Sequence, residues 1–598
     1  MYILGISCFF HDASAAIIKD GVLVAAAEEE RFTRIKHDSS FPNNAIAFCL
    51  EYAGIEGPDL DYVVFFEKPY IKFERLVTTA VAGFPLTYRM WAQSMRTWLF
   101  DKLWIRSQLE NATGIDRKRI LFSEHHMSHA ASAYYCSPFD NAAVLTFDGV
   151  GEWATTTIGE GKGTTLKINR EIRFPHSIGL LYSAFTAFLG FEVNEGEYKV
   201  MGMAPYGTPR YVDKIWKMVH QEPDGSFWID QQYFSFHHST RKSFTTKFTD
   251  LFGEPRDPMT PFITQDMSSH SHSGHSGHSG TESSNHNDQI EYNQYYADIA
   301  ASIQSVTEEL ILSLVKEAHR QTGQTNLCMA GGVALNAVAN GRILRETPIE
   351  QLYIQPSAGD GGGSLGAALY TWNSVLGNEN RFVMDHAYWG NEYSSENITA
   401  ALRKHNYNTS EIDDENRLMD MTVDRLLDGK VVGWFNGRFE WGPRALGNRS
   451  ILADPRERQM KDIVNTKVKF REPFRPFAPS VLAEKASSYF DIPDQEIGMV
   501  ERFMLTVSPI QNSQREAIPA VDHMGTARPQ TVHRDTNPRF HELIRKFGDT
   551  TGTPVLLNTS LNVQGEPIVS TPESALNTFE SSGLDTLVMG NFMIDREH

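Results

Sequence analysis

The sequence predicts a mixed α/β protein with two domains. A chain of 598 residues is too long for one hydrophobic core and should divide into two or three domains. Apolar strands and turns alternate over residues 1–28, whereas residues 295–320 keep a helical period without a breaker. The composition changes near Asn378, so we expect domains at residues 1–378 and 385–598.

The first domain contains two similar strand–turn–strand units. In residues 1–28 the pair Asp20-Gly21 separates two apolar runs and predicts a hairpin. Residues 142–159 repeat the order of strand, Asp-Gly turn and strand. Such a duplication is typical of actin-like folds, in which two similar lobes clasp a nucleotide. Two unrelated hairpins are the alternative that the pattern leaves open.

Two glycine-rich turns follow, each between an expected strand and an expected helix. The first contains Gly331-Gly332, and the second contains Asp360 and the run 361–363. Turns of this kind present free backbone N–H groups that suit phosphate or carboxyl groups. In the second domain, strands alternate with glycine turns over residues 425–456, and Ser570 or Thr571 should cap a late helix.

The composition of the chain limits which cellular compartment and which classes of binding partner we expect. The net charge of −19 disfavours binding to nucleic acid or to an anionic membrane. Four scattered cysteines indicate a reducing compartment, and no basic leader or long apolar run is present, so we expect a cytoplasmic protein. The tract Ser268–His286 consists of Ser, Gly, His and other polar residues, and should be a disordered insertion.

His125 and His129 are candidate metal ligands. They stand four apart in an alanine-rich segment that should be helical, so both imidazoles project from one face. Asp148 and Asp360 each follow an apolar strand and supply carboxylates. Two histidines and two carboxylates suit Fe(II), Mn(II) or Zn(II). Taken alone, a histidine pair at this spacing is more often a hydrogen-bonded surface pair, and His126 does not share its face.

A basic stretch stands out in this acidic chain. Residues 438–475 contain ten Lys and Arg against five Asp and Glu, a local balance of +5. Such a reversal predicts a pocket for a polyanion, with a nucleic-acid patch as the competing interpretation. The polar loop 558–562 follows an apolar strand and could hold phosphate oxygens beside these cations.

Many motifs of the chain resemble those of one family, the NodU/CmcH carbamoyltransferases, which make O-carbamoylated natural products. The resemblance runs from residue 4 to about residue 570, and the matching segments are long. They include FHDASAA, EEERFTRIKH, HHMSHAASAYYCSPF, EYKVMGMAPYG, SAGDGGGSLGAAL, GPRALGNRSILADPR, KFREPFRPFAPS and NTSLNVQGEPIV.

The resemblance implies a division of labour between two domains. Residues 1–378 would form an actin-like (ASKHA) domain similar to the TsaD transferase, and residues 385–598 a YrdC-like α/β domain. In the YrdC-like domain carbamoyl phosphate is hydrolysed, and the carbamate attacks ATP to give carbamoyl adenylate and pyrophosphate. In the TsaD-like domain a hydroxyl of a small-molecule natural product attacks the carbamoyl carbon, and AMP leaves. The implied partners are carbamoyl phosphate, ATP with Mg and a hydroxylated small molecule.

The resemblance also assigns residues. His125, His129, Asp148 and Asp360 would hold one divalent metal, with Fe(II) expected first and Mn or Zn as alternatives. His11 would deprotonate the acceptor hydroxyl at its ordinary pKa, or else be a buried, hydrogen-bonded histidine, and Asp12 and Lys36 would lie near the acceptor. The nucleotide of the transfer domain would be lined by Gly331, Gly332, Asn336 and Gly361. Carbamoyl phosphate and ATP would be bound by Arg444, Lys469, Arg471, Arg475, Arg528, Asn558, Ser560 and Asn562.

The chain departs from the family pattern at two places, and its features leave two other functions open. The tract Ser268–His286 is not part of the family pattern, and Met524 stands where an Asp is expected before Gly-Thr-Ala-Arg. Threonylcarbamoyl transfer to tRNA is an alternative that the acidic charge disfavours, and a non-catalytic actin-like scaffold that binds ATP or metal is another. Aromatic residues between Lys68 and Arg106 are candidates for a wall of the acceptor pocket.

Overall fold

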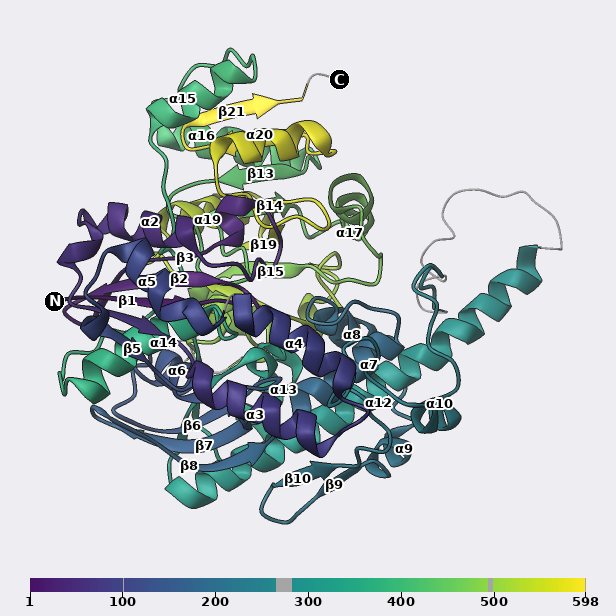
Figure 1. The fold of residues 1–598 in the computed structure, drawn as a ribbon. Helices are drawn as coiled ribbons and strands as arrows, with labels where there is room; N and C mark the ends of the chain where they lie inside the picture. The colour runs from purple at the N-terminus through teal and green to yellow at the C-terminus, as the bar shows by residue number, and fades with distance from the viewer. Residues whose placement is uncertain (101, 265–281, 493–497, 597–598) are drawn as a thin grey trace.

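A computed structural model describes residues 1–100, 102–264, 282–492 and 498–596 of the chain (Figure 1). It has a mixed α/β fold with two five-stranded sheets in the N-terminal part and a seven-stranded sheet in the C-terminal part. Among the described residues, no helix is both long and apolar enough to span a bilayer.

The first sheet has the strand order β3-β2-β1-β4-β5. Its first three strands form an antiparallel meander, and the last two run parallel to β1. The predicted hairpin turn is present, with both Asp20 (φ 50°) and Gly21 (φ 84°) in the left-handed region that such a turn requires. The strands are β1 (Tyr2–Ser7), β2 (Ser14–Lys19), β3 (Val22–Glu28), β4 (Tyr62–Phe65) and β5 (Ile120–Phe122).

The second sheet repeats this topology strand for strand. Its order is β12-β11-β6-β7-β8, with the same antiparallel meander followed by two parallel strands. The predicted duplication of the N-terminal part is therefore confirmed, and the hairpins are not unrelated. The strands are β6 (Asn141–Phe147), β7 (Ala154–Lys162), β8 (Thr165–Arg173), β11 (Asn326–Ala330) and β12 (Gln351–Ile354).

Two equivalent helices pack against each other between these sheets. Helix α6 (His125–Tyr134) follows β5, and α14 (Gly362–Tyr370) follows the corresponding strand β12. The close approach needs glycine, because a Cβ on Gly366 would lie 1.8 Å from the carbonyl oxygen of Ser128 in α6. Both helices therefore begin near one point, beside the ends of the two sheets.

Other helices cover the outer faces of the N-terminal part. The predicted helix at residues 295–320 is confirmed but longer, because α12 spans Glu282–Thr322. Of the predicted insertion Ser268–His286, residues 268–281 lie outside the described residues, and the loop prediction is wrong for 282–286, which begin α12. The remaining helices of this part are α1 (Glu30–Thr33), α2 (Asn43–Ala53), α3 (Pro69–Ala82), α4 (Tyr88–Phe100), α5 (Ile105–Thr113), α7 (Ile178–Phe188), α8 (Glu197–Met203), α9 (Val212–Trp216), α10 (Thr246–Phe252) and α13 (Ala337–Glu346).

The C-terminal sheet has the order β18-β15-β19-β14-β13-β20-β21 and apolar cores on both faces. Helices α15 and α20 contribute to one core, and α16 and α19 to the other. Thr571 caps α20 through a capping box, as predicted. The principal elements are β13 (Val432–Phe435), β14 (Arg449–Ala453), β15 (Ala478–Leu482), β18 (Gln530–Val532), β19 (Val555–Ser560), β20 (Thr586–Met589), β21 (Phe592–Asp595), α15 (Ser395–Lys404), α16 (Glu415–Leu427), α17 (Met460–Ile463), α18 (Ala486–Tyr489), α19 (Pro538–Thr551) and α20 (Pro572–Ser581).

Candidate active site

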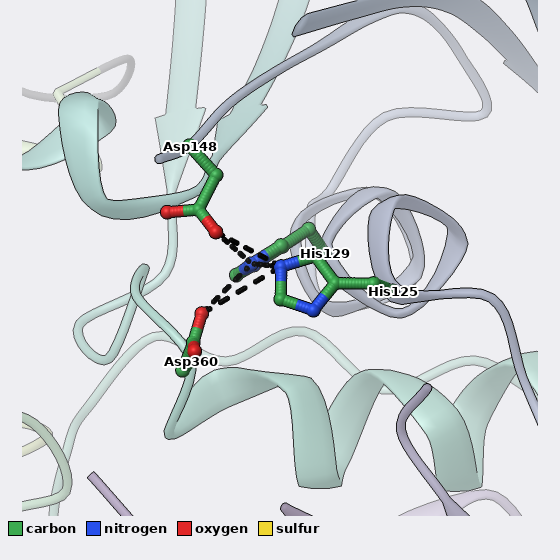
Figure 2. A group of neighbouring side chains, drawn as sticks. All are labelled: His125, His129, Asp148 and Asp360. Carbon is green, nitrogen blue, oxygen red and sulfur yellow. Dashed lines mark hydrogen bonds and ion pairs between the residues drawn. The ribbon is translucent and has the colours of Figure 1, made fainter. Parts of the chain in front are cut away.

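The predicted metal ligands converge on one point. Figure 2 shows the rings of His125 and His129 on α6 facing the carboxylates of Asp148, after β6, and Asp360, just before α14. The Nε2 atom of His125 lies 2.9 Å from Asp148 Oδ2, and that of His129 lies 3.3 Å from Asp360 Oδ1. All four ligand atoms lie within 4.8 Å of one another. The four residues come from three separate parts of the chain, and the fold unites them.

The donor set fits a small divalent metal ion. Tetrahedral bonds of roughly 2.0–2.2 Å place ligand atoms about 3.3–3.6 Å apart, which is close to the separations found here. The two Nε2 atoms are 3.1 Å apart, so they need either a proton between them or a shared cation. Buried atoms without hydrogen-bond partners surround the group, namely both Nδ1 atoms and Asp360 Oδ2.

Charges around α6 support this arrangement. The backbone N–H of His125 donates to Glu152 at 3.0 Å, which places a carboxylate at the positive end of the helix. Burial lowers the pKa of His129, but Asp148 and Asp360 outweigh burial and raise it to about 9. His126 is buried rather than on the surface and bonds to Thr146 and Ala154, and burial lowers its pKa to about 3.

Both ring nitrogens of His11 lie within hydrogen-bonding distance of an oxygen atom. Its Nδ1 lies 2.7 Å from Asp12 Oδ2, and its Nε2 lies 3.1 Å from the carbonyl oxygen of Asn194. Burial lowers the pKa of His11, but the bond to Asp12 outweighs it and raises the pKa to about 9. The expectation of an ordinary pKa is therefore wrong, because Asp12 stabilises the imidazolium. Lys36, the other predicted acceptor residue, pairs with Glu195.

Lys469 lies at the end of strand β19, among neutral hydrogen-bond acceptors. Its Nζ donates to the backbone carbonyls of Ser560 at 2.8 Å and Asn562 at 2.9 Å, and to the Asn562 side chain. Burial lowers the pKa of Lys469, and the neighbouring arginines lower it further. Residues 560–562 therefore lie beside Lys469, one of the cations that they were predicted to adjoin.

Three arginines share this pocket without an ionic partner. Among the described residues, Arg444, Arg471 and Arg528 form no ion pair with a carboxylate, whereas Arg475 pairs with Glu472 at 3.4 Å. The Nε atoms of Arg444 and Arg528 are buried without a hydrogen-bond partner. Burial lowers the pKa of Arg528, and the other arginines lower it further. Clustered, partly buried cations without counter-ions are costly, so the pocket is suited to a polyanionic ligand.

The metal centre and the cationic pocket open into one cavity. Its volume is about 890 Å³, and residues of both the N-terminal part and the C-terminal part line its wall. Sixteen of the predicted site residues line it: His11, Asp12, Lys36, Asp148, Gly332, Asn336, Asp360, Gly361, Arg444, Lys469, Arg471, Arg475, Arg528, Asn558, Ser560 and Asn562.

Some predicted residues do not have a simple ligand-facing role. Gly331 does not line this cavity; it has φ 96°, and a Cβ there would lie 1.9 Å from the carbonyl oxygen of Phe147. Close packing against β6 explains why a glycine occupies position 331. Asn336 caps α13 and also bonds to Gln304, and Asn558 donates to the backbone of the loop that carries Arg444.

The prediction for the aromatic residues of 68–106 is wrong. Among the described residues of this segment none lines the cavity, and several are largely exposed on or beside α3 and α4. Tyr70, for example, is 79% exposed and Phe84 is 71% exposed. Amphipathic helix patterns do not distinguish a pocket wall from an outer surface, and the topology placed this hairpin outside.

Other residues of the site were missed by sequence reasoning. His37 bonds to Asp12 at 2.8 Å, and Lys199 on α8 pairs with Glu472 at 2.9 Å. The ring of Tyr198 lies 4.8 Å from the guanidinium of Arg475. The only available signal was their position inside the motifs EEERFTRIKH and EYKVMGMAPYG, because these contacts join distant segments.

Two family models cover most of the chain. One, described as carbamoyltransferase N-terminus, matches residues 2–369, and the other, described as carbamoyltransferase C-terminus, matches residues 423–596. The chain belongs to the carbamoyltransferase family. The resemblance drawn from the motifs is thereby confirmed, and this carbamoyltransferase is an enzyme that transfers carbamoyl groups.

Relatives of this carbamoyltransferase span nearly its full length. It is 45% identical to an uncharacterized protein of Synechocystis, sll1178, over 99% of this chain and 96% of that protein. It is 35% identical to nodulation protein NolNO of Sinorhizobium fredii, over 98% and 79% of the two chains. Component A of (R)-2-hydroxyglutaryl-CoA dehydratase from Acidaminococcus fermentans matches 63% of this chain and 99% of its own, with 16% identity and a TM-score of 0.33. That score is too low to carry any property over.

Proposed function

We propose that this carbamoyltransferase is an ATP-dependent O-carbamoyltransferase that forms and uses carbamoyl adenylate within one cavity. The observation that carries the proposal is the composition of the cavity wall. Arginines that pair with no carboxylate in the described part of the chain line one side, and the Asp148 and Asp360 carboxylates of the metal centre line the other. One site suits phosphate groups and the other suits a metal-assisted transfer, which matches the two half-reactions implied by the family resemblance.

The cationic wall would carry the first half-reaction, in a YrdC-like domain of residues 385–598. Carbamoyl phosphate loses phosphate to water, an oxygen of the carbamate attacks the α-phosphorus of ATP, and pyrophosphate leaves. Arg444, Arg471 and Arg528 would neutralise the phosphate oxygens, and Mg bound together with ATP would supply further positive charge. Lys469, fixed by Ser560 and Asn562, would supply a further charge at a defined place.

The N-terminal, TsaD-like part (residues 1–378) would carry the transfer. The acceptor oxygen bonds to the carbamoyl carbon, the bond from that carbon to the phosphate oxygen breaks, and AMP leaves with the electron pair. His11 would accept the hydroxyl proton at Nε2 after losing its own Nε2 proton, while Asp12 holds Nδ1. A divalent ion held by His125, His129, Asp148 and Asp360, Fe(II) first with Mn or Zn as alternatives, would supply Lewis acidity.

The acceptor would be a small molecule with a hydroxyl group. The carbamoyltransferase carries a net charge of −19, which opposes a phosphate-rich macromolecule, and the cations of the cavity are assigned to ATP and carbamoyl phosphate. We therefore do not propose tRNA as the acceptor.

A direct test uses the full chain with ATP, carbamoyl phosphate and a panel of alcohols. The proposal expects carbamoyl adenylate and pyrophosphate without an acceptor, and AMP plus a carbamoylated alcohol with one, all detected by mass spectrometry. Carbamoylation that proceeds without ATP would refute the adenylate route.

A further inference from the structure

His37 lies on the far side of Asp12 from His11. Its Nδ1 is 2.8 Å from Asp12 Oδ1, whereas His11 Nδ1 is 2.7 Å from Asp12 Oδ2, so one carboxylate serves two histidines. The two imidazole rings are 4.5 Å apart between centroids. The backbone N–H of His37 donates to Glu30 Oε2 at 2.8 Å, which fixes the residue from its other side.

The backbone around this group is held in an uncommon conformation. Asp12 (φ 45°), His37 (φ 55°) and Asn194 (φ 68°) all lie in the left-handed region, and each contacts His11 or the carboxylate that His11 uses. Such positions cost conformational energy in residues other than glycine. When they cluster, they indicate that the surrounding structure holds side chains for a functional purpose.

The geometry of His11 creates a problem that His37 addresses. Both nitrogens of His11 face oxygen atoms, Asp12 Oδ2 and the Asn194 carbonyl, and only an imidazolium can donate to both. A base must instead present an unprotonated Nε2 to the acceptor hydroxyl. An Asp12 carboxylate engaged only by His11 would hold the proton on His11 more strongly.

We propose that His37 is a positioning residue that divides the hydrogen-bonding capacity of Asp12 and thereby keeps His11 able to act as the base of the transfer step. This inference rests on the proposed role of His11. His37 Nδ1–H donates to Asp12 Oδ1, which weakens the hold of Asp12 on the His11 proton and orients Oδ2 toward His11.

The sign of the effect does not depend on the charge of His37. A neutral His37 weakens the Asp12 acceptor by hydrogen bonding, and a protonated His37 also repels the His11 cation. Other charged groups act on His11 and Asp12 as well: Asp360 stabilises charged His11, and Arg31 interacts electrostatically with Asp12. The pair Lys36–Glu195 lies beside them on the cavity wall. None of these groups is altered when only the side chain of residue 37 changes.

Two substitutions at this position separate hydrogen bonding from backbone strain. Both glycine and asparagine tolerate the left-handed conformation of His37. His37→Gly removes the donor to Asp12, whereas in His37→Asn the amide nitrogen can take the place of Nδ1. The measurement is the pH dependence of AMP release in the transfer step, with carbamoyl adenylate supplied, together with thermal unfolding of each variant.

The proposal expects the acid limb of the transfer rate to move upward by about one pH unit in His37→Gly and to stay close to the wild-type limb in His37→Asn. Below the limb, transfer by His37→Gly then falls about tenfold, and the deficit closes at high pH. A loss that is equal at every pH, or identical limbs in the two variants, would overturn the proposal.

A second readout does not require transfer activity. The Cε1–H resonance of His11 in histidine-labelled protein, assigned by its loss in His11→Asn, should titrate at a higher pH in His37→Gly than in His37→Asn. If the wild type transfers no carbamoyl group, the proposed function fails while this titration still decides the role of His37. Equal His11 titration in both variants contradicts it.

Discussion

Gly366→Ala should separate the two halves of the metal centre. Its Cβ would lie 1.8 Å from the carbonyl oxygen of Ser128 and 2.9 Å from the backbone nitrogen of Ser132, both in α6. Cβ atoms almost never approach closer than 3.0 Å, so α6 and α14 must move apart by at least 3.0 − 1.8 = 1.2 Å. His129 follows Ser128 on α6, and Asp360 precedes α14.

Metal coordination tolerates displacements of only roughly 0.2 Å. An opening of 1.2 Å, worked out above from the Gly366 contact, should therefore lower metal affinity by at least about 100-fold. The overpacking should cost about 1–3 kcal/mol of folding stability, reduced by about 1 kcal/mol because alanine is the better helix former. Metal content after dialysis, calorimetric titration with Fe(II), Mn(II) and Zn(II), and thermal unfolding measure both effects.

Gly202→Ala is the matched control. Gly202 also lies in a helix, α8, and a Cβ there would meet nothing closer than 3.6 Å. This variant should bind metal like the wild type. If Gly366→Ala also keeps wild-type metal affinity and unfolding temperature, the account of the α6–α14 contact is wrong.

Three further predictions follow from the cavity. Arg528→Met should raise the unfolding temperature and weaken ATP binding, because it removes a partly buried cation that pairs with no carboxylate among the described residues, as calorimetry of both processes can check. His523→Gln should reduce acid destabilisation. Burial and Lys461 lower the pKa of His523 to about 4, so between pH 6.5 and about 4 the unfolded state binds a proton that the folded state does not. The stability of the wild type therefore falls by up to about 3 kcal/mol as the pH falls through this range. Denaturant titrations should show a smaller fall in the variant. Asp360→Asn should retain the fold by circular dichroism while losing metal content, since it removes one of two carboxylate ligands.

Local patterns were sufficient to predict much of the fold. The pair Asp20-Gly21 needs a left-handed turn, and the i, i+4 spacing of His125 and His129 needs one helix face, so both could be inferred without tertiary information. The duplicated strand order followed from repeated hairpins. The length of α12 could not be inferred, because polar residues at 282–286 carry no helical period and yet join the helix.

The electrostatics of the site could not be predicted from the sequence. His11 was expected to titrate near its ordinary pKa, but the adjacent Asp12 turns toward it and raises that pKa. His11 also contacts the Asn194 carbonyl, which is far away in the chain, and no local pattern could have shown this contact. For the same reason the exposed helices α3 and α4 were mistaken for a pocket wall.

The central claim is that one cavity performs two separable half-reactions. The most direct test compares the variants His125→Ala and Lys469→Ala in two assays. The first assay measures carbamoyl-phosphate-dependent exchange of pyrophosphate into ATP. The second measures AMP release from supplied carbamoyl adenylate in the presence of an acceptor. The account predicts that His125→Ala keeps the exchange and loses the transfer, and that Lys469→Ala shows the reverse. Loss of the exchange in His125→Ala with transfer intact, or equal loss of both activities in both folded variants, would contradict it.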